Sequence, residues 1–323
     1  MFLVLPYQSE HKELWNNFIH KAKNATFLFH RDFMEYHNDR FVDASLLIFK
    51  NEKLIAVFPA NKVENTVISH QGLTYGGLLF DSNLKFNHVL NIFKVVLKHL
   101  SDANITTLGL KLLPNIYASS PNDELKYLMF ILQAKLERRD VLSVIQLSEV
   151  VKRSKDRKEG YKRGLKMGLV VKEEQQLKTF WKDLLEVNLK EKYKTKPVHS
   201  LEEIQQLKAV FPNAIRQFNV YYNHVLVAGT TIFETEHVAH SQYISGNQDN
   251  NKLGSLDFLH CYLIDTVFKD KRYFDFGISN ENAGKNINSG LLYWKEGFGA
   301  RAITQDFYSI QTNKHTLLDA VLL

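Results

Sequence analysis

The sequence predicts an α/β (α+β) protein made of two similar domains in tandem, each with a mixed, mostly antiparallel sheet flanked by helices. Two observations predict this fold class. Short apolar runs bounded by turn residues alternate with segments of helical period, which is typical of sheets covered by helices. The order of these runs in the first half of the chain recurs in the second half. We therefore expect one domain at residues 1–150 and another at residues 151–323.

The first domain is expected to begin with a short strand and an amphipathic helix. The clearest helical period in the chain, with seven apolar residues on one face, lies within residues 86–100. A glycine pair, Gly76 and Gly77, falls inside an expected third strand and indicates a bulge there. The expected strands are 3–5, 45–50, 54–61, 72–80, 105–113 and 141–147, and the expected helices are 9–22, 86–100 and 125–136.

The second domain is expected to repeat this order. Ser200 and Glu203 form a capping box that begins a helix. The expected strands are 169–171, 215–222, 225–233, 239–245, 273–278 and part of 302–310, and helical periods lie in 177–184, 200–211, 256–267 and up to Trp294. Three matches with closely similar spacing, Leu54 with Val225, Tyr75 with Tyr243 and Leu108 with Phe274, predict a tandem duplication, and ordinary alternation of strands and helices is the alternative.

Composition limits the class of protein. The chain has 323 residues, 45% of them hydrophobic and 24% charged, which is typical of a soluble globular protein. No apolar run is long enough to span a membrane, and the run before Pro6 is too short for a signal-peptide core, so a cytoplasmic location is expected. The single cysteine, Cys261, excludes an internal disulfide and a cysteine-based metal cluster, and is expected to be a buried thiol. No metal site is expected.

The net charge of +6 is concentrated in one segment, residues 152–166, where eight lysines and arginines accompany only Asp156 and Glu159. Such a segment either binds phosphate groups, because clustered basic side chains attract them regardless of sequence, or forms the solvent-exposed face of a helix. The sequence leaves both interpretations open.

Two stretches resemble a known family. The residues Tyr273-Phe-Asp-Phe-Gly277, then Gly290-Leu291, then Trp294-Lys-Glu-Gly-Phe-Gly299 resemble the signature of FemAB-like acyltransferases of the GNAT superfamily. The basic segment from Arg153 to Val170 is similar to the inter-domain helix of the same family. The resemblance implies two tandem GNAT domains, of which the second, opened by the basic helix, is catalytic and the first is supporting.

The resemblance also implies an activity. The chain would transfer an acyl or aminoacyl group from an activated donor to an amine by direct attack, and the acceptor would be a small molecule such as a cell-envelope or nucleotide-sugar precursor. The alternative is a GNAT-fold module that binds a nucleotide or nucleic acid without catalysis. No permanently bound cofactor is expected.

The donor would bind where the strands 239–245 and 272–278 diverge. The residues implied for donor binding are Ile244, Ser245, Gly246, Asn247, Lys252, Gly254, Ser255 and Asn280. Residues 249–255 match only loosely the glycine-containing loop that holds the CoA pyrophosphate at a helix N-terminus. The donor is therefore left open between acyl-CoA, such as acetyl-CoA, and aminoacyl-tRNA.

Asp275, Glu281 and Tyr243 are the candidates for catalytic proton transfer. An acid in the middle of a strand is costly to bury unless it is paired or catalytic, so Asp275 is either catalytic or paired with Arg272 or a backbone N–H. Glu281 lies in a polar loop, where solvated acids are common.

The remaining candidates concern the acceptor and a metal. His70, Tyr75, Lys295 and Arg163 are expected at the acceptor site, with a turn and core packing as the alternatives for the first two. His237 and His240 are expected on opposite faces of their strand and therefore share no metal.

Overall fold

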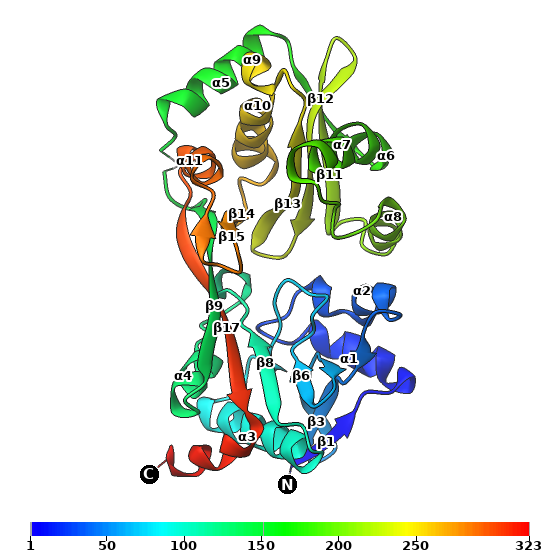
Figure 1. Cartoon of the computed structure of the whole chain (residues 1–323), viewed down its shortest axis with the longest axis vertical. Helices are drawn as coiled ribbons and strands as arrows, with labels where there is room; N and C mark the ends of the chain where they lie inside the picture. The colour runs from blue at the N-terminus through cyan, green and yellow to red at the C-terminus, as the bar shows by residue number, and fades with distance from the viewer. Residues whose placement is uncertain (1, 151, 323) are drawn as a thin grey trace. The chain divides into compact units, whose positions relative to one another are not determined.

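The computed structural model describes residues 2–150 and 152–322 (Figure 1). The chain divides into two compact units: unit 1 consists of Met1–Asp140 and Thr304–Leu323, and unit 2 of Val141–Ile303. The observed division differs from the expected one at residue 150, because unit 2 begins at Val141 and the end of the chain belongs to unit 1. Two strands, β9 (Lys135–Gln146) and β17 (Arg301–Gln311), have residues in both units.

Unit 1 has two sets of paired strands. One set has the order β1-β3-β4-β7 and is antiparallel throughout. In the other, β17 pairs antiparallel with β8, β8 pairs parallel with β6, and β5 and β2 follow antiparallel. The strands are β1 (Phe2–Pro6), β2 (Val42–Asp43), β3 (Leu46–Lys50), β4 (Lys53–Phe58), β5 (Asn61–Val63), β6 (Thr66–Ile68), β7 (Leu79–Phe80) and β8 (Thr107–Lys111). The helices are η1 (Ser9–His11), α1 (Lys12–Ile19), η2 (Phe27–Phe29), α2 (Arg31–Met34), η3 (Glu35–His37), α3 (Phe86–Asp102), η4 (Asn115–Tyr117), α4 (Glu124–Ile131) and η8 (Thr312–Ala320).

The core of unit 1 is built around α3. Its predicted apolar face, including Phe93 and Leu97, is buried against strand residues such as Phe58 and Leu108. Ile310 of β17 and Leu318 of η8 belong to the same buried cluster. The last part of the chain therefore completes the core that the first part begins.

Unit 2 has one mixed sheet in the order β10-β11-β12-β13-β14-β9; in the part that the structure describes, β13 and β14 pair in parallel and the other neighbours antiparallel. In Figure 1, α5 and α10 lie on one face of this sheet and α6, α7 and α8 on the other. The strands are β10 (Val170–Glu174), β11 (Ile215–Tyr222), β12 (Val225–Glu234), β13 (Val238–Gly246), β14 (Tyr273–Ile278), β15 (Asn280–Glu281) and β16 (Asn286–Ile287). The helices are α5 (Lys155–Lys166), α6 (Lys178–Phe180), η5 (Trp181–Leu185), α7 (Glu186–Asn188), η6 (Leu189–Tyr193), α8 (Leu201–Val210), α9 (Asn250–Leu253), α10 (Ser255–Tyr262), η7 (Leu263–Val267) and α11 (Ser289–Gly297).

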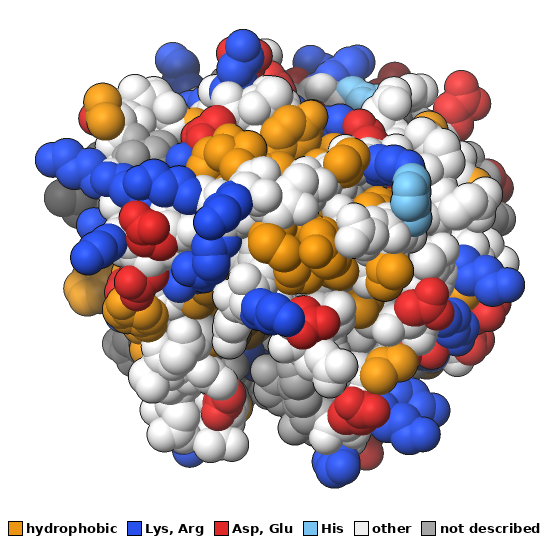
Figure 2. Space-filling model, turned by 90° about the horizontal axis from the view of Figure 1, so that it is seen from above, with side chains coloured by type: hydrophobic (Ala, Val, Ile, Leu, Met, Phe, Trp, Pro, Cys, Tyr) orange, Lys and Arg blue, Asp and Glu red, His pale blue; other side chains and the backbone are white. Residues whose placement is uncertain are grey.

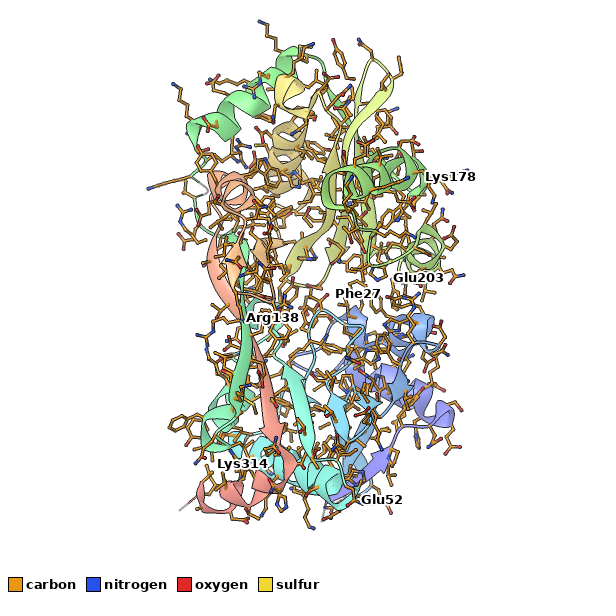
Figure 3. The ribbon with its side chains drawn as sticks, in the orientation of Figure 1. Phe27, Glu52, Arg138, Lys178, Glu203 and Lys314 are labelled. Atoms are coloured by element: carbon orange, nitrogen blue, oxygen red, sulfur yellow. The ribbon has the colours of Figure 1, made fainter. Side chains whose placement is uncertain are left out.

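Two helical segments lie on the face of the unit 2 sheet opposite α10. Lys178 and Glu203, labelled in Figure 3, lie in the first turns of α6 and α8. Segments of α-helix and π-helix alternate from α6 to η6. The predicted capping box of α8 is confirmed, since the Ser200 side chain accepts from Glu203 N and Glu203 accepts from Ser200 N.

Glycines allow α5 to pack closely on α10. A Cβ added at Gly164 would lie 2.6 Å from Phe258 Cβ, and one added at Gly160 would overlap the Asp257 carboxylate. Real side-chain atoms are not found this close to one another, so both positions require glycine. The backbone of α5 therefore lies directly against the first turns of α10.

The predicted fold class is confirmed, and three local expectations are corrected. The third strand expected at residues 72–80 is mostly a loop: the backbone is left-handed at His70, just before it, and at Gly77 within it, and only Leu79 and Phe80 pair with β4. The helix expected at 125–136 ends at Ile131, because the following residues enter β9. The basic helix, which the resemblance implies in the segment from Arg153 onward, begins at Lys155.

Two further expectations concern Cys261 and membrane spans. Cys261 is buried as expected, and burial raises the pKa of its thiol to about 12. None of the helices in the described ranges has the length and apolar character needed to cross a bilayer.

We expect His260 to make the protein sensitive to acid. It is fully buried on α10, and burial lowers its pKa to about 4, whereas an unfolded histidine titrates near 6.5. Between these pH values the unfolded chain binds more protons, so the free energy of unfolding falls as pH falls from about 6.5 to about 4. The contribution of His260 is about 3 kcal/mol. Chemical denaturation at several pH values should show a shallower pH dependence for His260→Gln.

The control is His224→Asn, at the exposed tip of the β11–β12 hairpin, which should leave the pH dependence unchanged. An equal pH dependence in the wild type and in His260→Gln would contradict the assignment.

Candidate functional site

The site begins where β13 and β14 separate. β13 pairs with β12 along nearly its whole length, from Ala239 to Gly246. Among the described residues it pairs with β14 at only three positions, the last being His240 with Asp275. Residues 241–246 therefore have an edge outside this ladder, which we call the open edge of β13. The divergence expected between these strands is thus observed.

Backbone N–H groups point toward the open edge. Asn247 N, just after β13, donates to Val227 O of β12 at 2.9 Å, so this N–H faces β12. Because N–H groups along a strand alternate between its two sides, those of Ile244 and Gly246 face away from β12. These two donors are among the residues predicted for the donor site.

Asp275 and His240 form an acid–imidazole pair at the last ladder position. Asp275 has no exposed surface, and its Oδ2 lies 2.9 Å from His240 Nδ1. Its Oδ1 accepts a 2.6 Å hydrogen bond from Gly277 N. An imidazole and a backbone N–H are thus among the partners of this carboxylate. With the carboxylate accepting from Nδ1–H, a neutral His240 has Nε2 available to accept a proton.

Gly277 shapes the end of β14. The register between β14 and β9 shifts between Asp275 and Ile278, and Gly277 in this bulge has a φ of +68°. A Cβ added there would lie 3.1 Å from His240 Cε1. The glycine therefore permits both the left-handed backbone and the close approach to the imidazole.

Lys295 of α11 holds the same bulge from the other side. Its buried Nζ donates to Gly277 O at 3.1 Å and to Ile278 O at 2.6 Å. Burial lowers the pKa of Lys295 to about 8, although the nearby Asp275 charge opposes this shift. In this structure the ammonium thus binds backbone carbonyls, and the role predicted for Lys295 in acceptor binding stays a prediction.

Unit 1 lacks this pair at the equivalent position. Its parallel ladder, β6 with β8, also has three registered pairs, and the last is Ile68 with Gly109. The predicted match of Leu108 with Phe274 agrees with this register, because each is the middle residue of its ladder. The match of Tyr75 with Tyr243 does not, because Tyr75 lies in the loop that replaces the expected strand. Among the described residues, the last ladder pair carries titratable side chains in unit 2 and none in unit 1.

Tyr243 and Ser245 connect β13 to the segment from α6 to α8. Tyr243 Oη lies 2.6 Å from His199 Nδ1 and accepts a 3.3 Å hydrogen bond from His199 N. Asn188 Nδ2 donates to Ser245 Oγ at 2.6 Å and to Gly246 O at 2.8 Å. Sequence reasoning missed Asn188 and His199, because single polar residues in a helix and a loop carry no spacing signal.

The start of α10 is occupied by protein groups. Ser255 is fully buried, and its Oγ donates to Asn250 Oδ1 at 2.9 Å, as does Leu256 N. A Cβ added at Gly254 would overlap the carbonyl oxygen of Gly160 in α5. The predicted contacts of Gly254 and Ser255 with a donor phosphate would therefore require α5 to move away.

Asp257, in the first turn of α10, adds a negative charge at this position. It accepts from Arg157 Nη1 at 2.6 Å and from Trp294 Nε1 at 3.0 Å. A pyrophosphate at this helix start would meet the carboxylate.

The polar loop after β14 lies partly at the surface. Asn280 Oδ1 accepts from Val141 N at 2.7 Å, which anchors the loop to β9. Glu281 is exposed in the β15–β16 hairpin and accepts from Asn288 Nδ2 at 3.1 Å. Its position fits the solvated alternative, and its catalytic role stays a prediction. Lys252 is exposed on α9.

The residues predicted for the acceptor site are divided between the units. His70 and Tyr75 are buried in unit 1, where His70 stacks on His37 and Tyr75 Oη lies 3.0 Å from Thr26 Oγ1. Burial lowers the pKa of His70 to about 3. Arg163 is exposed on α5 of unit 2 and donates to Asn251 O at 3.3 Å.

Comparison with known proteins identifies the architecture. No family model and no curated protein sequence matches the chain. Among solved structures, FemX superposes with a TM-score of 0.68 over 99% of each chain, at 10% identity. The chain has a FemX-like tandem GNAT fold.

Two other structures share this FemX-like fold. L-PGS from Bacillus licheniformis has a TM-score of 0.59 at 13% identity, covering 97% of this chain and 96% of that one. A tandem GNAT protein from the clavulanic acid biosynthesis pathway has a TM-score of 0.50 at 12% identity, covering 97% and 99%. At these identities the similarity concerns the fold, and it confirms the two-domain GNAT architecture expected from the resemblance.

Replacing Gly277 with alanine should displace His240. Gly168 is the matched control, since its φ is +70° and a Cβ there would meet nothing within 4 Å. Both variants should lose about 1 kcal/mol of stability from left-handed backbone strain. Only Gly277→Ala should also shift the His240 imidazole resonances in NMR spectra. Identical His240 resonances in both variants would contradict the predicted contact.

Proposed function

We propose that this protein is an acyltransferase that acts in unit 2, moving an acyl or aminoacyl group from an activated donor to an amine. The observation that carries the proposal is the His240–Asp275 pair at the last ladder position before β13 and β14 diverge. A general base and unpaired backbone N–H donors on the same strand are groups that acyl transfer to an amine requires.

The geometry suggests a direct mechanism. The acceptor amine attacks the donor carbonyl carbon, and an N–H group on the open edge of β13, such as that of Ile244, donates to the carbonyl oxygen as it becomes negative. His240 Nε2 takes a proton from the attacking nitrogen, while Asp275 holds Nδ1–H and stabilises the imidazolium. When the tetrahedral intermediate collapses, the C–N bond remains, the bond to the leaving oxygen or sulfur breaks, and the imidazolium returns the proton to the leaving group.

Unit 1 is proposed to support this site without a reaction of its own. Its equivalent ladder ends in Ile68 and Gly109, which can neither accept nor donate a proton through a side chain. The acceptor is proposed to be a small molecule, with a cell-envelope or nucleotide-sugar precursor as the class to test first.

For the donor we favour an aminoacyl ester of tRNA over acyl-CoA. The start of α10, where a GNAT fold would bind the CoA pyrophosphate, carries the Asp257 carboxylate and lies against the backbone of α5. A donor held at the open edge of β13 needs no phosphate contact at this helix start. This preference rests on the packing of Gly160 and Gly254.

Removing either member of the pair should abolish transfer without unfolding the protein. His240→Gln and Asp275→Asn should each reduce the rate by about 10²- to 10⁴-fold, the usual contribution of a positioned base. The assay follows radiolabel from aminoacyl-tRNA or acetyl-CoA into the amine fraction of a cell extract. Near-UV circular dichroism reports whether each variant keeps its packed structure.

His237→Gln is the control, since His237 immediately precedes the same strand and is not assigned to the site. If His240→Gln keeps full activity while Glu281→Gln loses it, proton transfer belongs to the polar loop and the proposed base is wrong. If the wild type transfers from neither donor, a non-catalytic binding module is the better description.

The donor preference predicts a difference in thermal stabilisation. A ligand at about 100 times its dissociation constant adds roughly 2.7 kcal/mol to the free energy of unfolding. We expect a mixed aminoacyl-tRNA pool to raise Tm and acetyl-CoA or CoA to leave it unchanged. A rise in Tm with acetyl-CoA alone would show that α5 moves away from the start of α10 when CoA binds. The preferred donor would then be acyl-CoA.

A further inference from the structure

The basic residues of α5 and of the residues just before it fall into two groups. Arg153 and Arg157 are largely buried and form ion pairs, Arg153 Nη1 with Asp265 Oδ2 at 2.7 Å and Arg157 Nη1 with Asp257 Oδ1 at 2.6 Å. These two arginines hold α5 to α10 and η7. The exposed basic side chains of the helix are Lys155, Lys158, Lys162, Arg163 and Lys166.

Four of these lysines form a single stripe, which we call the lysine row: Lys155, Lys158, Lys162 and Lys166. Their spacing of three and four residues places them on one side of the helix, with neighbouring Cβ atoms about 5–6 Å apart. The row is about 16 Å long at 1.5 Å per residue. It therefore presents positive charges at nearly regular intervals.

The acids of the segment neutralise little of this charge. Asp156 accepts a 2.7 Å hydrogen bond from Tyr293 Oη, which directs it toward α11. Glu159 lies 3.5 Å from Lys162 Nζ in an exposed pair. An exposed pair of this kind contributes little energy and does not prevent Lys162 from binding another anion.

We propose that the lysine row binds the phosphate backbone of an RNA. A nucleic-acid strand is a linear array of phosphates, and a straight row of lysines neutralises several of them without reading bases. Within the proposed function, which this inference extends, the RNA is the carrier of the aminoacyl group.

Contacts within unit 2 connect the lysine row with the open edge of β13. Arg163, on the same helix, donates to Asn251 O in α9 at 3.3 Å. The adjacent Asn250 lies against the end of β13, since a Cβ on Gly246 would be 3.2 Å from Asn250 Cβ. Lys252, exposed on α9, extends the basic surface in this direction. An RNA on α5 thus has a short path for its reactive end to reach β13.

Basic side chains gather on one side of the molecular surface. In Figure 2, lysine and arginine side chains gather on the left, the side on which α5 lies in Figure 1. Some acidic side chains lie among them, but lysine and arginine side chains cover more of this area. The surface is therefore positive over an area larger than one side chain.

The chemistry of α5 favours RNA over an anionic membrane. A helix that lies in a membrane interface needs an apolar face to bury among the lipids. The face of α5 that carries Gly160 and Gly164 is packed on α10, and Leu165 is the one large apolar side chain exposed among the described residues of the helix. Positive charge without an apolar face is typical of a surface for phosphates in water.

The test compares two variants with the same change in net charge. In the row variant, Lys155, Lys158, Lys162 and Lys166 are replaced by glutamine, which keeps helix propensity close to that of lysine. In the control variant, four exposed lysines of unit 1, Lys53, Lys62, Lys85 and Lys126, are replaced by glutamine. Binding of a fluorescently labelled RNA hairpin with a single-stranded 3′ tail is measured by anisotropy at several salt concentrations.

We expect the row variant to bind this RNA at least about tenfold more weakly than the wild type, and the slope of log K against log salt to become shallower by about 3. The control variant should bind like the wild type. Equal loss in both variants, or no loss in the row variant, would overturn the proposal. Binding of the wild type to phosphatidylglycerol vesicles but not to the RNA, lost in the row variant, would overturn it in favour of a membrane.

The binding assay is independent of the reaction. His240→Gln should bind the RNA like the wild type, because the imidazole lies apart from the lysine row in the sequence and in its contacts. If His240→Gln loses transfer while the row variant binds RNA normally, the reaction stands and the RNA surface is wrong. If the row variant loses RNA binding and the His240 and Asp275 variants keep full activity, the surface stands and the proposed mechanism is wrong.

Discussion

The buried carboxylate of Asp275 is the constraint on which the site depends. A charged group without exposed surface is stable only when its oxygens accept hydrogen bonds. Here the donors are His240 on β13 and the backbone of Gly277 in the β14 bulge. Lys295 then holds the bulge through the carbonyls of Gly277 and Ile278. Because these groups share partners, displacing β13, the β14 bulge or α11 would remove a hydrogen bond from a buried polar group.

The two units show what part of this arrangement belongs to the fold. Both end a three-pair parallel ladder at the same register, and in each unit a lysine binds nearby backbone carbonyls. In unit 1 this lysine is Lys111, which donates to Gln71 O at 3.1 Å and whose pKa is lowered to about 8 by burial. The units differ in the last ladder pair. Gly109 occupies the position of Asp275, and Ile68 that of His240. The ladder and a lysine that binds carbonyls are therefore found in both units, although Lys111 lies on β8 and Lys295 on α11, and the titratable pair is particular to unit 2.

The sequence was sufficient for the fold class because periodicity and the repeated order are local properties. Apolar spacing located α3, α8 and the strands of unit 2 within a few residues. The expected strand at 72–80 failed because Gly76 and Gly77 were interpreted as a bulge in a strand, whereas positive φ angles at His70 and Gly77 turn this segment into a loop. Asp275 was recognised from its position between aromatic residues. Its partner His240 was not, because pairing across parallel strands depends on a register that no local pattern encodes. The covering of the α10 start by α5 depends likewise on contacts between distant glycines.

The last strand and the helical turns that follow it have a consequence for biosynthesis. β17 pairs with β8, Thr312 N donates to Thr106 O at 3.0 Å, and Ile310 and Leu318 are buried in the core that α3 organises. Residues 1–140 are made before residues 304–322, so their sheet and core lack these partners until residues 304–322 have left the exit tunnel. Residues 141–303 are contiguous and can fold earlier. Of the two units, the one whose synthesis begins first is thus the one that finishes folding last, and until then it exposes the edge of β8.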